Sequence, residues 1–318
     1  QLRRMLLAAV LASPVAAHAQ DYPTRPIKII VPYAPGGGVD RLARVVSETL
    51  REKWGQPVIV ENRAGANGNV GAEHVEKAGP DGYRLLYAPP GPLVINKLLY
   101  PKLSYDPDTF VPVSVIAMSP NVLTVHPRLS VDSVQQLIAF AKAQPDRLSY
   151  ASPGSGGTPH LSAELFKMMT GVKIVHVPYK GTGPLLTDLL GGHVDLTFSE
   201  LGNVLQHVRG GKLHALAVGS AKRNSLLPEV PTMSEVLPGF VSATWSGLVA
   251  PAGTPPAIAD RLSTVIHDAL KQPEAVKRFL ETSSLEVIAS RPSEMALLMK
   301  QERERWGKVI RAIGATVN

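Results

Sequence analysis

Two glycine-rich segments of the chain have the composition of anion-binding turns. Residues 34–40 read Ala-Pro-Gly-Gly-Gly-Val-Asp, and residues 152–160 read Ser-Pro-Gly-Ser-Gly-Gly-Thr-Pro-His. Glycine lets backbone N–H groups approach a ligand closely, and the first turn of a helix carries unpaired N–H donors with a partial positive charge. Two such turns that face each other across a cleft would hold a small anion without a metal ion or a covalent bond. The pattern therefore favours a binding protein over a catalyst.

Ser155 and His160 open one catalytic alternative, an exported serine hydrolase, because they lie five residues apart in the second turn. Such an enzyme needs a positioned nucleophile, an acid partner and an oxyanion hole. The chain has no Gly-x-Ser-x-Gly elbow, no His-Glu-x-x-His and no phosphate-binding P-loop motif. It also has no cysteine, which excludes disulfides, thiolate catalysis and cysteine-based zinc sites. We therefore expect no enzymatic activity, no cofactor and no metal site.

Each glycine-rich turn follows a short apolar run and precedes a helical pattern. Residues 27–31 are almost continuously apolar, which is typical of a strand covered on both faces. Similar strand and helix signals alternate along most of the chain, so we predict an α/β fold with a largely parallel sheet. Residues 111–118 and 122–126 are predicted as two extended segments.

The length of 318 residues suits two domains. The second turn lies near the middle of the chain, as expected if one domain were inserted into the other. We predict the first domain at 20–120 and 246–318, the second at 121–245, and hinge crossings near 118–122 and 243–247.

The N-terminal residues have the organisation of a secretory signal. Arg3 and Arg4 precede the apolar residues 5–15, and residues 17–19 read Ala-His-Ala. About 20 apolar residues are needed to span a membrane, so this segment is too short for an anchor. We predict a signal peptide at residues 1–19 and a periplasmic location. Its removal lowers the formal net charge from +7 to +5, and no basic cluster with interleaved aromatic residues indicates nucleic acid.

Eight short motifs, in order along the chain, resemble those of the Bug family, the extracytoplasmic solute receptors of the tripartite tricarboxylate transporter type. They lie at residues 22–27, 32–37, 55–63, 80–83, 176–181, 188–192, 210–213 and 248–255. The resemblance implies a two-domain, type II-like periplasmic binding protein that closes about a hinge over a cleft between the domains. It further implies a carboxylate ligand held by backbone amides and bridging waters, delivery to membrane permease subunits, and a monomer.

The residues expected to line the ligand site come from the glycine-rich turns and the segments beside them. They are Tyr33, Pro35, Gly36, Gly37, Gly38, Asp40, Asn67, Ser152, Ser155, Gly156, Gly157, Thr158, His160, Tyr179 and Glu200. Several have structural alternatives: Asp40 could complement the helix dipole, Ser155 and Thr158 could cap a helix, and the two tyrosines could pack in the core. Trp245 could pack on the hinge or cover the ligand.

Two positions depart from the family pattern and bear on the ligand. Glu200 stands where the family often has Asp, and an acid there could bind a ligand amine or organise water. Ala88-Pro89-Pro90-Gly91 replaces the Ser, Thr or Asn residues common after the third strand, and proline offers no N–H. This suggests a ligand with an apolar or aromatic body. Dicarboxylates, aromatic acids and amino acids all stay open, as does a role as the sensing subunit of a signalling partner.

Overall fold

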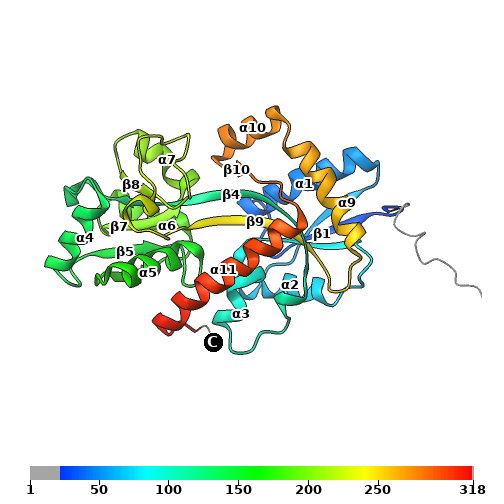
Figure 1. The fold of residues 1–318 in the computed structure, drawn as a ribbon, viewed down its shortest axis with the longest axis horizontal. Helices are drawn as coiled ribbons and strands as arrows, with labels where there is room; N and C mark the ends of the chain where they lie inside the picture. Colours follow the sequence, from blue (N-terminus) through cyan, green and yellow to red (C-terminus); the bar gives the residue numbers. More distant parts are fainter. Residues whose placement is uncertain (1–21, 317–318) are drawn as a thin grey trace, which may run out of the picture.

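The computed structural model describes residues 22–316, except the side chains of residues 282 and 283. The predicted signal peptide at residues 1–19 lies outside the described residues. Two lobes lie side by side and are joined by two long strands (Figure 1). Within residues 22–316, no helix combines the length and the apolar character needed to cross a membrane.

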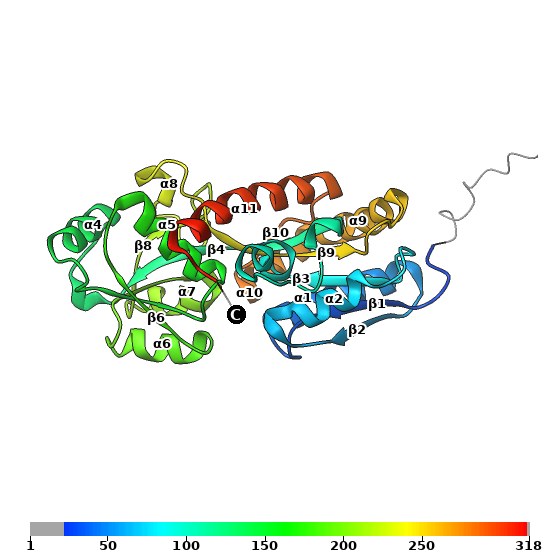
Figure 2. The ribbon, with the colours of Figure 1, turned by 90° about the horizontal axis from the view of Figure 1, so that it is seen from below.

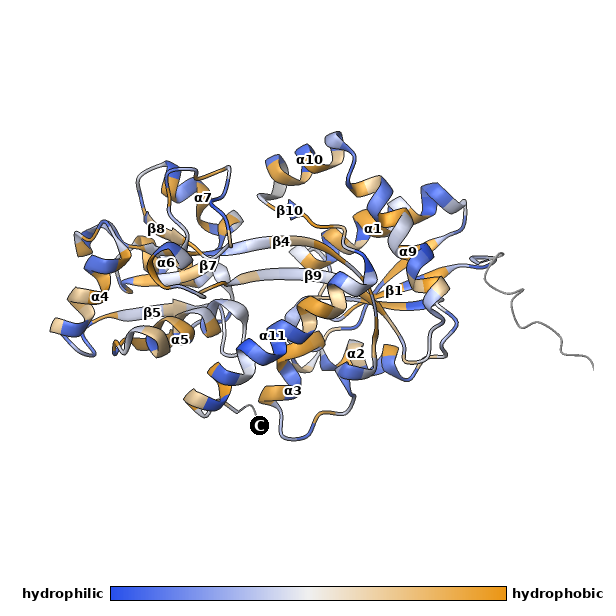
Figure 3. Ribbon diagram, viewed as in Figure 1, coloured by the Kyte–Doolittle hydropathy of each residue, from blue (hydrophilic) through white to orange (hydrophobic). Residues whose placement is uncertain are grey.

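The first lobe is built on three parallel strands with helices on both sides of the sheet (Figures 1 and 2). The strands are β1 (Ile27–Val31), β2 (Val58–Asn62) and β3 (Arg84–Ala88). The helices are α1 (Gly38–Trp54), α2 (Asn69–Glu76), α3 (Asn96–Leu99), α9 (Pro256–Leu270), α10 (Pro273–Ser283) and α11 (Pro292–Ile313). Every side chain of β1 except that of Lys28 is buried, which explains its apolar run (Figure 3).

The second lobe repeats this plan with its own three parallel strands. These are β5 (Ser149–Ser152), β6 (Val175–Pro178) and β7 (Leu196–Glu200). A further strand, β8 (His214–Val218), pairs antiparallel with the connecting strand β4 (Val111–Val125). The helices are α4 (Val134–Ala143), α5 (Thr158–Thr170), α6 (Thr182–Leu190), α7 (Leu201–Arg209) and α8 (Met233–Val236).

Two antiparallel strands, β4 (Val111–Val125) and β9 (Ala243–Ala250), connect the lobes. β4 pairs with β9 up to Pro120 and with β7 from Asn121 onward, so it passes from one sheet to the other between these residues. Proline is tolerated there because β4 changes partners at this point. The α/β fold in two lobes is confirmed, and the predicted domain boundaries stay predictions.

Two details of the prediction are wrong. The extended segments predicted at 111–118 and 122–126 form a single strand. The sheet is mixed, because β4 leads into the second lobe while β9 leads back and runs antiparallel to it, and β10 (Glu286–Val287) also pairs antiparallel with β4.

α11 extends from the first lobe onto the second and lies along the connecting strands (Figure 1). Its buried Glu302 accepts a hydrogen bond from the indole of Trp306 at 2.7 Å. Trp245 on β9 is also buried beneath this helix, and within residues 22–316 its indole Nε1 has no hydrogen-bond partner. Of the two interpretations of Trp245, the structure supports packing on the connecting strands.

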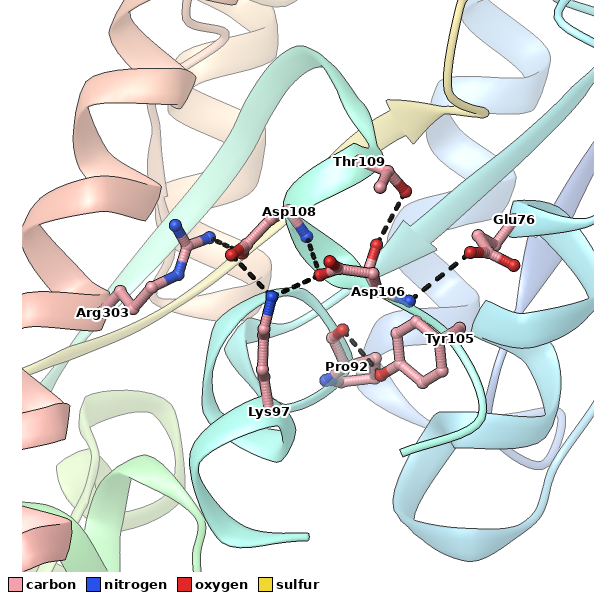
Figure 4. Close-up of polar contacts among 8 residues, drawn as sticks. All are labelled: Glu76, Pro92, Lys97, Tyr105, Asp106, Asp108, Thr109 and Arg303. Carbon is pink, nitrogen blue, oxygen red and sulfur yellow. Dashed lines mark hydrogen bonds and ion pairs between the residues drawn. The ribbon is translucent and has the colours of Figure 1, made fainter. Parts of the chain in front are cut away.

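A cluster of charged residues fastens α11 to the first lobe (Figure 4). Arg303 forms an ion pair with Asp108 at 2.5 Å, and Lys97 lies 2.8 Å from Asp108 and 2.6 Å from Asp106. Because Lys97 belongs to α3, this cluster also fixes the segment that faces the second glycine-rich turn.

Candidate binding cleft

The predicted site residues gather at the carboxyl ends of the parallel strands in both lobes. Strands β1, β2 and β3 end at Val31, Asn62 and Ala88. Strands β5, β6 and β7 end at Ser152, Pro178 and Glu200. Figure 1 shows β5 directed toward the first lobe, and Figure 2 shows β2 directed toward the second. Ligands of open α/β sheets bind at this edge, so the arrangement defines a candidate cleft between the lobes.

The first glycine-rich turn presents its backbone at the start of α1. Residues 34–38 are exposed, Gly36 has φ +87°, and α1 begins at Gly38 with Gly37 as its N-cap. A helix leaves its first N–H groups without intrahelical partners. The N–H groups of Gly37 and Gly38 are therefore donors at an exposed, partially positive helix end.

Asp40 stabilises the first glycine-rich turn through hydrogen bonds to its buried carboxylate. Its buried carboxylate accepts hydrogen bonds from the Gly36 N–H at 2.9 Å, from Arg44 at 3.0 Å and from Asn62 at 2.9 Å. Burial acts to raise the pKa of Asp40, but these hydrogen bonds outweigh it and lower the pKa to about 2. The Gly36 N–H is thus occupied within the protein. The structure gives Asp40 a structural role in the turn, and a ligand contact for it stays a prediction.

The second turn is held by two histidines. Ser152 Oγ is buried and lies 2.7 Å from Nε2 of His176 and 3.1 Å from the Gly154 carbonyl. The Gly156 N–H donates to Nδ1 of His160 at 3.3 Å. Burial, aided by the nearby His176, lowers the pKa of His160 to about 4, so its ring is neutral near pH 7.

Gly156 also brings the two lobes together. It has φ +85°, and a Cβ on it would lie 2.5 Å from Cδ1 of Leu99 in the first lobe. Gly157 is the N-cap of α5, and both Ser155 and Gly157 are exposed beside this contact. The second turn therefore presents a helix start beside this contact with the first lobe.

The geometry does not support a serine hydrolase. Between the described Ser155 and His160 there is no hydrogen bond, and Nδ1 of His160 accepts one from the Gly156 N–H. Ser152 contacts His176, but its side chain is fully buried. Across residues 22–316, no three His, Asp or Glu side chains gather as metal ligands.

A chain of hydroxyl and carboxyl groups links the second turn to the connecting strands. Thr158 Oγ1 lies 2.5 Å from Thr244 Oγ1 on β9, and Thr244 Oγ1 lies 3.5 Å from Asn121 Oδ1 on β4. Glu200 pairs with Asn121 across β7 and β4. Burial raises the pKa of Glu200, and a hydrogen bond with Thr244 partly opposes the rise.

The remaining predicted residues lie in turns or against the core. Asn67 is exposed with φ +52°, and its Nδ2 donates to Asn96 Oδ1 at 3.2 Å. Tyr33 is half-buried with its hydroxyl beside Gly68 and Gly91, and burial raises its pKa.

Tyr179 is also half-buried, and its hydroxyl donates to Asp188 at 2.6 Å. Burial and this carboxylate raise the pKa of Tyr179 to about 12. Both tyrosines thus have the structural contacts of their alternative role, and ligand contact stays a prediction for each.

Sequence reasoning missed two groups beside the cleft. Asn96 is fully buried and donates to the Asn67 carbonyl at 3.1 Å and to Asn69 at 2.6 Å, which fixes the third glycine-rich turn. The rings of His160 and His176 lie 4.5 Å apart, and Tyr150 stacks on His176 at 4.7 Å. One sequence signal could have pointed to the histidine group: His160, Glu164 and Lys167 are spaced to lie on one face of a helix.

Comparison with known proteins agrees with this architecture. The family described as the tripartite tricarboxylate transporter family receptor matches residues 42–315. Protein BugT of Bordetella pertussis is 41% identical over 310 residues, which cover 96% of this chain and 94% of BugT.

Two solved structures resemble the chain over almost its whole length. Rpa4515 of R. palustris with adipate is 40% identical with a TM-score of 0.79, covering 93% of this chain and 100% of that one. MatC of Rhodopseudomonas palustris with bound malate is 32% identical with a TM-score of 0.74, covering 91% and 100%. The resemblance to Bug-type receptors is confirmed: the chain belongs to the tripartite tricarboxylate transporter receptor family.

Proposed function

We propose that this protein is a periplasmic solute receptor that binds a small carboxylate between the turns at 34–40 and 152–160 and delivers it to membrane permease subunits of a tripartite tricarboxylate-type transporter. The observation that carries the proposal is the pair of helix starts, at Gly38 and Thr158, on the facing strand ends of the two lobes. The bound adipate and malate of the two related structures support a carboxylate as the ligand class.

In this proposal the backbone supplies most of the binding. The N–H groups of Gly37, Gly38 and Gly157 donate to ligand oxygens or to bridging waters, and the Ser155 and Thr158 hydroxyls add adaptable hydrogen bonds. A ligand that contacts both lobes stabilises the arrangement in which they meet, so binding shifts the population toward closed molecules. No bond of the ligand is broken, and the protein acts as a monomer after export through the signal peptide at residues 1–19.

The test is a thermal-shift screen of residues 20–318 against aliphatic dicarboxylates, aromatic acids and amino acids. A ligand at about 100 times its dissociation constant adds about 2.7 kcal/mol of stability and raises the melting temperature by a few degrees. We expect a selective hit that is recovered chemically unchanged. Consumption of the hit would indicate an enzyme, and a flat response across all carboxylates would contradict the proposal.

The same screen tests the expectation drawn from Ala88-Pro89-Pro90-Gly91. Pro90 is buried, and the backbone turns into a helical segment, Gly91–Ile95, directly after it. A preference for benzoate-like acids over short aliphatic dicarboxylates would support a ligand with an apolar body. A clear preference for malate or succinate would exclude it.

A further inference from the structure

Glu200, which is half-buried, differs from the four fully buried acids of residues 22–316 in forming no ion pair. Four buried acids each form an ion pair: Asp40 with Arg44 at 3.0 Å, Glu164 with Lys167 at 2.7 Å, Asp195 with Arg128 at 2.6 Å and Glu302 with Arg305 at 2.5 Å. Within residues 22–316, no Lys, Arg or His side chain lies close enough to Glu200 to form an ion pair with it. Acids removed from water are normally paired, because an uncompensated buried charge is costly.

The contacts of the Glu200 side chain within the protein also do not require a negative charge at this position. Glu200 is the N-cap residue of α7, yet its side chain makes no capping hydrogen bond. Its protein contact is the hydroxyl of Thr244, which a neutral amide would satisfy equally well. Glu200 is half-buried and lies at the end of β7, at the strand edge of the candidate cleft. These features point to a partner that comes from outside the chain.

The position of Glu200 restricts the charge of the ligand group that can bind it. Thr244 Oγ1 lies 2.5 Å from Oγ1 of Thr158, the first residue of α5, and 3.5 Å from Oδ1 of Asn121. Asn121 in turn pairs with Glu200 across β4 and β7. A ligand carboxylate at the start of α5 would therefore lie near the carboxylate of Glu200. A second ligand carboxylate at this place would be repelled, whereas a cationic group beside the first carboxylate would be attracted to Glu200 and form a charge-assisted hydrogen bond.

We propose that the solute carries a protonated amine close to its carboxylate, as an amino acid does, and that Glu200 determines this specificity by accepting hydrogen bonds from the amine. The inference rests on the proposed function, because it assumes that a ligand carboxylate binds at α5. The ammonium replaces the solvation that Glu200 loses by burial. It thereby also offsets the rise in the pKa of that carboxyl group.

The experiment compares pairs of acids that share a carbon skeleton and differ in the amine. Calorimetric titrations at pH 7 use aspartate against succinate, glutamate against glutarate, and phenylalanine against 3-phenylpropanoate. For the skeleton that fits the cleft, we expect the amino member to bind wild-type protein at least about tenfold more tightly. In Glu200→Gln, which keeps size and the Thr244 contact, we expect this preference to fall below about threefold. Glu229→Gln, a change at an exposed acid of the second lobe, should keep the wild-type preference.

The outcomes separate this inference from the function on which it rests. Equal or tighter binding of the acid that lacks the amine overturns the role of Glu200 and leaves the receptor proposal intact. An amine preference that survives in Glu200→Gln also overturns it. If none of these acids, nor any other carboxylate of the thermal-shift panel, binds wild-type protein, the proposed function fails and the inference falls with it. The wild-type comparison decides the question even if the variant is unstable.

Discussion

A methyl group at Gly156 is expected to weaken ligand binding by keeping the lobes apart. In Gly156→Ala the new Cβ would lie 2.5 Å from Cδ1 of Leu99, whereas ordinary carbon contacts lie near 3.5–4.0 Å. Leu99 is buried, so its side chain has little room to turn away. Overpacking of this kind costs about 1–3 kcal/mol. The overlap disappears when the lobes separate, so the cost opposes closure and predicts a dissociation constant about 5 to 150 times larger.

A second effect of the substitution must be separated from the first. The backbone of Gly156 has φ +85°, and a left-handed conformation costs an L-residue about 1–2 kcal/mol. That strain destabilises the folded protein whether the lobes are open or closed. Gly171→Ala is the matched control, because Gly171 has φ +71° and a Cβ there would meet nothing within 4 Å. We expect the control to lose folding stability with an unchanged dissociation constant.

The assay is calorimetric titration of both variants with the hit of the thermal-shift screen. Gly156→Ala combined with Leu99→Val tests the contact directly, since valine has no Cδ atom and the double variant should recover much of the lost affinity. If Gly156→Ala binds as tightly as Gly171→Ala, the contact between this turn and Leu99 does not control closure, and the reasoning is refuted.

Two further predictions concern pH and stability. Because hydrogen bonds lower the pKa of Asp40 to about 2, its contribution to stability is complete above about pH 4 and is lost as the pH falls toward 2. Urea titrations should show Asp40→Asn about 1–2 kcal/mol less stable than wild type at pH 7 and equal to it near pH 2, and equal stability at pH 7 would contradict the role of Asp40. Because burial lowers the pKa of His160 to about 4, stability is complete above about pH 6.5 and declines as the pH falls toward 4, by up to about 3 kcal/mol. His160→Gln should flatten this decline, whereas His193→Gln, a change at an exposed histidine, should not, and identical slopes for all three proteins would exclude His160 as its source.

The local part of the site could be predicted from the sequence because its signals are local. Glycine marks the turns at 34–40 and 152–160, and the helices that follow begin where expected, at Gly38 and Thr158. The β1 strand was evident from its apolar run, since both faces of that strand are covered. These features depend on backbone conformation and burial within a few residues.

The side-chain and interlobe contacts of the candidate site could not be predicted from the sequence, because they join residues that are distant along the chain. Gly156 meets Leu99 and Thr158 meets Thr244 only after the second lobe is inserted between the connecting strands. The contact between the tilted rings of His160 and His176 joins α5 to the next strand, and neither residue shows this in its local pattern. For the same reason the sequence could place an acid at Glu200 but could not show that it lacks a cation.

The central claim, that backbone N–H groups of the first turn hold the ligand, is tested most directly by deleting one of them. Gly38 is the first residue of α1, where proline fits a helix, and the preceding Gly37 has the extended backbone that proline requires. Gly38→Pro removes the N–H, whereas Gly38→Ala keeps it, and a Cβ at this position meets nothing within 4 Å. In calorimetric titrations with the thermal-shift hit, we predict that Gly38→Ala binds like wild type and that Gly38→Pro binds about 10 to 100 times more weakly. Equal affinities of the two variants would contradict the claim.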